Sequence, residues 1–172
     1  MRGIAIHLET SGFGADPRVY AQFVRNALRN LIMVNLFAYQ ADPTLPSIYD
    51  AGIVYRREPP GYEQFADVAT VLRRGHGDCE DLACAVAAWR VVRTGELARP
   101  CITWKALSAN HWLYHITVLR ADGSREDPSA LRGMRDEPGE WVRRDALWIY
   151  ELFSGRRGFV PEPLPVIERR AA

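Results

Sequence analysis

Three residues in the middle of the chain have side chains that could act together in nucleophilic chemistry. Cys79 follows the glycine-rich stretch Gly75-His76-Gly77 and begins an apolar segment. His115 lies inside the apolar run 114–118, and Asp127 follows it after a turn signal. A thiolate is a strong nucleophile, an imidazole can take the thiol proton, and a carboxylate can orient the imidazole. These residue types, in this order, predict a thiol-dependent site.

Cys79 is predicted to lie at the N-terminus of a buried helix. Asp78 suits the N-cap position, and Glu80 and Asp81 would lie in the first turn, where the helix dipole favours acids. From 82 to 92 apolar residues cover almost the whole circumference, which is typical of a buried helix. A helix N-terminus lowers the pKa of a thiol, whereas the acidic neighbours of this thiol disfavour the thiolate.

After this helix the pattern changes to period two and predicts strands over 98–107 and 112–120. Asp122-Gly123 predicts a tight turn, and a short return strand would bring Asp127 back beside the first strand. Residues four apart on a strand share a face, so His111 and His115 could both face the helix. Either histidine could then act as the base.

The remaining segments are expected to surround this core. Helices followed by antiparallel strands predict an α+β fold, with a central buried helix packed on an antiparallel sheet, in a single domain over residues 1–172. The expected segments are a short strand or arm over 1–14, a helix from Asp16-Pro17 to about Tyr39, a long loop over 41–61, a helix over 65–73 stopped by Gly75, a helix or strand over 140–153, and an extended tail over 161–172.

Composition excludes several classes of function. The chain has 172 residues and a net charge of +1, without the basic surplus that nucleic-acid binders usually carry. No apolar run reaches the ~20 residues that span a bilayer, and the first residues do not resemble a signal peptide. Three cysteines do not make a disulfide framework. We therefore expect a cytoplasmic protein, or one associated with a virion, with no membrane or nucleic-acid partner.

A zinc site is another possibility that these residue types raise. Cys79 and Cys84, with His111 and His115, have spacings within the loose range of zinc ligands. Helical residues five apart are turned by about 140° from each other, so the two thiols of one helix cannot reach one ion. The chain also lacks a glycine-rich phosphate loop. We therefore expect neither a metal nor a cofactor.

The segments GHGDCEDLACAVAAWRV and YHITVLRADGSREDPS resemble the transglutaminase-like branch of the papain-like fold. The family's Gly-Asp-Cys, histidine and Asp-Pro motifs correspond to Gly77-Asp78-Cys79, His115 and Asp127-Pro128, within a motif core over 65–130. The resemblance implies a papain/transglutaminase-like fold whose Cys-His-Asp triad acts on amide bonds, as a peptidase, an amidase or an acyl transferase. The interval from His115 to Asp127 is shorter than usual in the family, and His111 gives a more common one, so His111 stays the alternative base.

The resemblance also implies partners and leaves one alternative function. Small proteins of this kind occur in tailed-phage and prophage gene sets, so the implied partners are a protein or peptide substrate, including a peptidoglycan peptide, and virion or tail proteins. The family's oxyanion donor is an upstream aromatic or amide side chain, for which Tyr55, Tyr62 and Gln64 are unranked candidates. The alternative is a catalytically silent module of the same fold in phage assembly, which the acidic residues around Cys79 favour.

Overall fold

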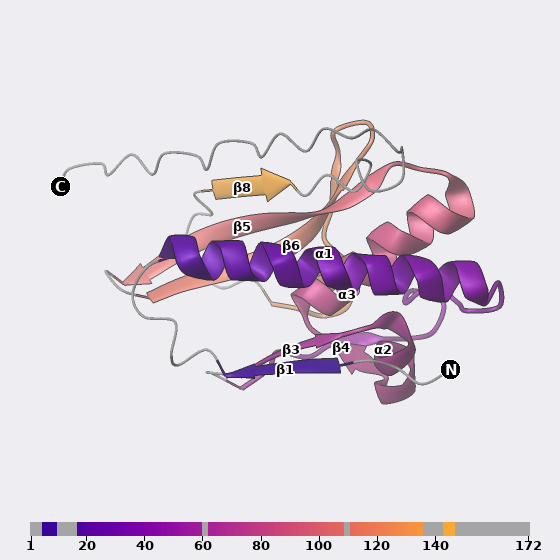
Figure 1. Ribbon diagram of the computed structural model, residues 1–172, viewed down its shortest axis with the longest axis horizontal. Coiled ribbons are helices and arrows are strands. Elements are labelled where there is room, and N and C mark those ends of the chain that lie inside the picture. The colour runs from indigo at the N-terminus through magenta and orange to yellow at the C-terminus, as the bar shows by residue number, and fades with distance from the viewer. Residues whose placement is uncertain (1–4, 10–16, 60–61, 109–110, 136–142, 147–172) are drawn as a thin grey trace.

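The computed structural model describes residues 5–9, 17–59, 62–108, 111–135 and 143–146 (Figure 1). The chain combines helices with a mainly antiparallel set of strands, and the expected α+β class is confirmed. The elements are β1 (Ala5–Glu9), α1 (Pro17–Ala41), β2 (Val54–Tyr55), β3 (Tyr62–Ala66), α2 (Val68–Arg74), β4 (His76–Gly77), α3 (Cys79–Trp89), the π-helical η1 (Arg90–Thr94), β5 (Ala98–Ser108), β6 (His111–Arg120), β7 (Arg125–Glu126), α4 (Pro128–Leu131) and β8 (Arg143–Ala146).

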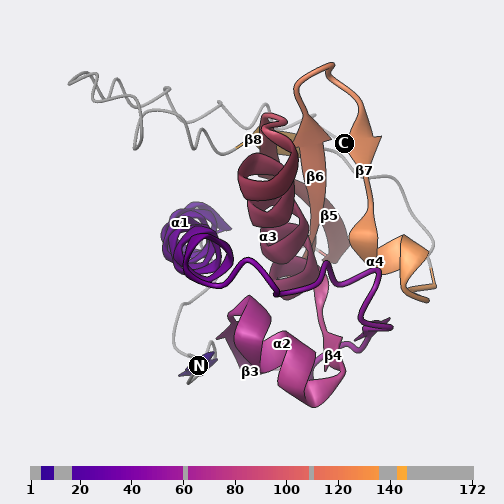
Figure 2. The same cartoon turned by 90° about the vertical axis from the view of Figure 1, so that its right-hand side faces the viewer.

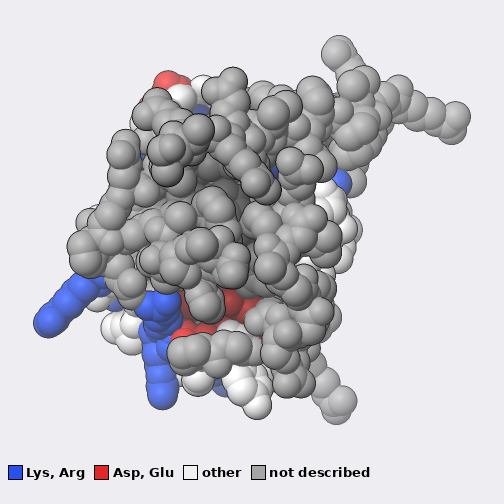
Figure 3. Space-filling view, turned by 90° about the vertical axis from the view of Figure 1, so that its left-hand side faces the viewer, with Lys and Arg blue, Asp and Glu red and all other residues white. Residues whose placement is uncertain are grey.

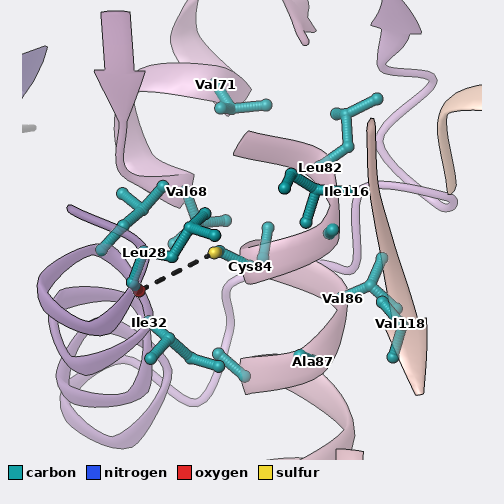
Figure 4. Close-up of a cluster of buried hydrophobic side chains, with 14 of the residues drawn as sticks. Leu28, Ile32, Val68, Val71, Leu82, Cys84, Val86, Ala87, Ile116 and Val118 are labelled. Carbon is teal, nitrogen blue, oxygen red and sulfur yellow. Dashed lines mark hydrogen bonds between the residues drawn. The ribbon is translucent and has the colours of Figure 1, made fainter. Parts of the chain in front are cut away.

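Helix α3 is the centre of the fold. It lies between α1 and the strands of the largest sheet (Figure 2). Leu28 and Ile32 of α1 pack on one side of α3, and Ile116 and Val118 of β6 pack on the other side (Figure 4). Every residue of α3 from Cys79 to Ala88 is buried, because its apolar side chains cover the whole circumference. The expected buried helix on an antiparallel sheet is therefore confirmed.

The large sheet has the strand order β7-β6-β5-β8, and all of its pairs are antiparallel. Strands β5 and β6 form the long hairpin expected from the period-two pattern, with Ile102 opposite Ile116. Strand β8 pairs with β5 and resolves the open choice between helix and strand for residues 143–146 in favour of a strand. The expected tail over 161–172 lies outside the described residues.

A smaller part of the fold corrects two expectations. The predicted helix over 65–73 begins only at Val68, because Phe65 and Ala66 belong to β3 and pair with β1. The expected long loop over 41–61 contains β2, which runs parallel to β4 with Tyr55 opposite Gly77. That pairing brings the loop against the residues that precede Cys79.

A polar network holds the end of α3 to the sheet. The Glu126 carboxylate of β7 accepts hydrogen bonds from the Tyr49 hydroxyl and from Nη2 of Arg90, the latter at 2.6 Å. Arg90 also pairs with Glu96 at 2.7 Å, and Glu96 accepts a further bond from Nε of Arg120. These bonds hold β7 in place and so determine the position of Asp127, which follows β7 and is the N-cap residue of α4.

No helix in the described ranges is long and apolar enough to cross a membrane.

A buried amide links α1 to the start of α2. The Oδ1 atom of Asn35 accepts a 2.7 Å hydrogen bond from the N–H of Val68, and Asn35 is fully buried on the otherwise apolar face of α1. Because Val68 is the first residue of α2, its N–H has no partner inside that helix. Asn35 therefore supplies the acceptor that the helix lacks.

We predict that Asn35→Ala lowers the free energy of unfolding by about 1–3 kcal/mol, since it leaves the buried Val68 N–H without an acceptor. Asn30→Ala, on an exposed position of the same helix, should change it by less than about 0.5 kcal/mol. Urea denaturation followed by circular dichroism measures both. Equal effects of the two substitutions would show that the Asn35 bond contributes nothing.

Candidate active site

Cys79 lies at the first residue of α3, with its side chain 7% exposed. Its thiol donates a hydrogen bond to Oε2 of Glu80 at 3.1 Å. The backbone N–H of Ile116 in β6 acts in the opposite sense to the acids and lowers the pKa of the thiol. Strand β7 pairs only with Val118 and Leu119 of β6, so its pairing stops short of Ile116.

His115 and Asp127 form the second part of the site. Nε2 of His115 lies 2.8 Å from Oδ2 of Asp127, and the imidazole is buried. The other oxygen of Asp127 accepts the N–H of Ala130 at 3.0 Å and so caps α4. Burial alone would raise the pKa of Asp127, but the bond with His115 and the capping N–H groups hold that pKa below its usual value.

Strand geometry corrects one expectation about the histidines. Successive side chains of a strand point to opposite faces. Ile116 and Val118 pack on α3, so His115 lies on the other face of β6, together with Thr117. His115 is nevertheless the residue directly before Ile116, whose backbone N–H favours the thiolate of Cys79. The structure therefore pairs His115 with Asp127, and Cys79 begins the helix that packs on the other face of β6. The side chain of His111 lies outside the described residues.

Acidic side chains crowd the thiol on the α3 side. Burial raises the pKa of Cys79, and the carboxyl groups of Glu80 and Asp78 raise it further. Burial likewise raises the pKa values of Asp78, Glu80 and Asp81. Burial also raises the pKa of Glu58, in the loop before β3, to about 7. Around Cys79 the electrostatic field therefore favours neutral forms over anions.

Two side chains that the sequence did not indicate belong to this cluster. The Tyr114 hydroxyl lies 2.5 Å from Oε2 of Glu63 and 3.3 Å from Oε1 of Glu80. Tyr114 precedes His115 and has the opposite orientation, toward α3. The alternation of side chains along the predicted strand, with Ile116 facing the helix, could have placed Tyr114 on the same side from the sequence. Glu63 has no such signal, because its position depends on the pairing of β3 with β1.

Of the three candidate oxyanion donors, Tyr55 is the one whose pKa is raised by Cys79. Tyr55 is half-buried on β2, and its pKa is raised by burial, then by Cys79 and Asp78. Tyr62 is 62% exposed. The Gln64 side chain accepts a hydrogen bond from Arg74, and the backbone N–H of Gln64 donates to Glu58. Tyr55 is therefore the candidate that lies within electrostatic reach of Cys79.

The other two cysteines are buried in different surroundings. Cys84 points toward α1, where its sulfur lies 4.0 Å from the carbonyl oxygen of Leu28 (Figure 4). Cys101 accepts a hydrogen bond from Nη2 of Arg125 at 3.0 Å. Cys79 and Cys84 therefore face different elements and cannot share a metal ion.

Comparisons with known proteins add no relative. No family model, no curated protein and no solved structure matches the chain.

We predict that Asp127→Asn lowers stability near neutral pH and that this deficit disappears in acid. Asparagine keeps the cap on Ala130 but loses the carboxylate that pairs with His115. Because the folded state lowers the pKa of Asp127, the carboxylate stabilises the fold above its unfolded pKa, about 3.9, and this contribution is lost as the pH falls through the lowered value.

Urea denaturation across this pH range measures the difference, with Asp50→Asn, at an exposed carboxyl elsewhere, as the matched control. A deficit of the same size in acid and at neutral pH would contradict a stabilising carboxylate–imidazole bond.

Proposed function

We propose that the chain is a cysteine-dependent hydrolase or acyl transferase that acts on amide bonds, with a papain/transglutaminase-like arrangement of Cys79, His115 and Asp127. The observation that carries the proposal is the Asp127–His115 hydrogen bond on β6, one residue before Ile116, whose backbone N–H favours the thiolate of Cys79. This bond gives a base its orienting carboxylate, and the proposed nucleophile begins the helix that packs on the same strand.

The order of the elements supports the finer fold proposal. A thiol begins the buried helix, an imidazole follows on the strand packed beside that helix, and a carboxylate follows the next strand. This is the order of the transglutaminase-like motifs that the sequence resembles. The resemblance over 65–130 and the local geometry thus point to the same three residues.

The proposed reaction has two steps. In the first, His115 takes the proton of Cys79, and the thiolate attacks the carbonyl carbon of an amide. The C–N bond breaks, the amine leaves with the proton from His115, and a thioester remains on Cys79. In the second, water or another amine attacks the thioester, which gives hydrolysis or transamidation. Asp127 holds the His115 ring through Nε2 and leaves Nδ1 as the nitrogen to exchange the proton.

An oxyanion formed during these steps needs donors. The N-terminal amides of α3 carry the positive end of the helix dipole. The Tyr55 hydroxyl is the side-chain candidate, since Tyr55 lies opposite Gly77 in the β2–β4 pair. The proposed substrate is a protein or peptide, including a peptidoglycan peptide.

A second function is favoured by a specific observation. The Cys79 thiol is buried, bonded to the Glu80 carboxylate and surrounded by acids that raise its pKa. These features suit a thiol that stays protonated. They favour a catalytically silent module of the same fold, with virion or tail proteins as its proposed partners.

Alkylation of the three cysteines separates the two functions. If His115 activates Cys79, iodoacetamide should modify Cys79 faster than Cys84 and Cys101 near neutral pH, and His115→Ala should slow Cys79 about tenfold or more. Peptide mass spectrometry resolves the three sites.

His111→Ala is the matched control, because it removes the alternative base on the same strand. A loss of Cys79 reactivity in His111→Ala alone would assign the base to His111. A Cys79 that reacts no faster than Cys84 in the wild type would overturn the enzyme and favour the silent module.

A further inference from the structure

Four carboxyl groups from three segments converge beside α3. Glu58 comes from the loop before β3, Glu63 comes from β3, and Asp78 and Glu80 flank Cys79 at the start of α3. One oxygen from each lies within 4.8 Å of the corresponding oxygens of the other three. Asp78 and Glu80 are buried, whereas Glu58 and Glu63 are half-buried, so the cluster extends from the interior toward the surface.

Within the part of the chain that the structure describes, the interior carboxyl groups lack a counter-charge. Neither Asp78 nor Glu80 takes part in an ion pair within the described residues. Asp78 is 6% exposed, and its Oδ1 atom has no hydrogen-bond partner among the described residues. A buried anionic oxygen without a donor is costly, and either a bound cation or a proton must offset it.

Hydrogen bonds from neighbouring residues orient three of these carboxyl groups. The N–H of Gln64 donates to Oε2 of Glu58 at 2.6 Å. The Tyr114 hydroxyl bonds to both Glu63 and Glu80. Bonds of this kind, behind the ligand atoms, fix the orientation of metal-binding carboxylates in proteins.

We propose that Glu58, Glu63, Asp78 and Glu80 form a binding site for a divalent cation of the Ca²⁺ type. This inference does not rest on the proposed function, and it departs from the expectation of no metal drawn from the sequence. Hard divalent cations prefer carboxylate oxygens, and four carboxylates without a cysteine or histidine ligand do not suit zinc or copper.

The spread of the oxygens selects among hard cations. Ca²⁺ binds oxygen at about 2.3–2.6 Å, so two of its ligands can lie about 5 Å apart, whereas Mg²⁺ allows about 4.2 Å. The four oxygens lie within 4.8 Å of one another, which is inside the span that Ca²⁺ allows. A few acidic side chains are visible on one face of the molecule beside Lys and Arg side chains (Figure 3).

The test is titration of the metal-free full-length protein with Ca²⁺, followed by isothermal calorimetry and by the melting temperature. We expect one saturable event with a Kd below about 1 mM and a rise in melting temperature that a chelator reverses. Glu63→Gln and Glu58→Gln should each weaken binding about tenfold or more. Mg²⁺ should bind more weakly than Ca²⁺.

Asp50→Asn, at an exposed carboxyl outside the cluster, is the matched control and should bind like the wild type. Circular dichroism confirms that each variant is folded, and two half-buried ligands are tested so that one misfolded variant does not decide the result. The absence of saturable Ca²⁺ binding in the wild type would overturn the proposal, because protons would then be what neutralises the cluster. Binding that survives both substitutions would overturn it as well.

Discussion

The burial of carboxyl groups at the start of α3 is the constraint on which the rest of this structure depends. Asp78, Glu80 and Asp81 are almost fully enclosed, although each would prefer water when ionised. Hydrogen bonds from neighbouring elements replace part of the lost hydration of these carboxyl groups. The N–H of Ala66 donates to Asp81, and the Cys79 thiol and the Tyr114 hydroxyl donate to Glu80. Strands β3 and β6 are therefore tied to the tip of α3 by polar bonds as well as by the apolar core. The thiol lies at the point where these bonds meet.

This arrangement gives the two sides of Cys79 different chemistry. On one side the acids of α3 and β3 favour a protonated thiol and, in our proposal, a bound cation. On the other side the Ile116 amide favours the thiolate, and the adjacent His115 is hydrogen-bonded to Asp127. A cation in the cluster would offset the negative charge on the first side and leave the second side unchanged. In our proposals, the charge of this acidic cluster decides whether the Cys79 thiol can act as a nucleophile.

Much of the fold could be predicted from local sequence signals. Propensity and periodicity reveal the buried helix after Asp78, the hairpin of β5 and β6, and the position of Asp127 past an Asp-Gly turn, because each depends on residues that are close in the chain.

Other features depend on residues that are far apart in the sequence. The start of α2 was predicted too early, because Phe65 pairs with the distant strand β1. The face of His115 was also mistaken, since the apolar neighbours Ile116 and Val118 determine which side of β6 packs on α3. The carboxyl cluster could not be predicted at all, because it requires the loop, β3 and α3 to meet in three dimensions.

The central claim is that Cys79 acts as a nucleophile assisted by His115, and trapping of an acyl-enzyme tests it most directly. The protein would be mixed with an activated ester, p-nitrophenyl acetate, quenched in acid and analysed by intact-protein and peptide mass spectrometry. The account predicts acetylation of Cys79 in the wild type, slowed by about 100-fold or more in His115→Ala and unchanged in His111→Ala. Acetylation of Cys79 at the same rate in the wild type and in His115→Ala, or no acetylation of Cys79 at all, would contradict it.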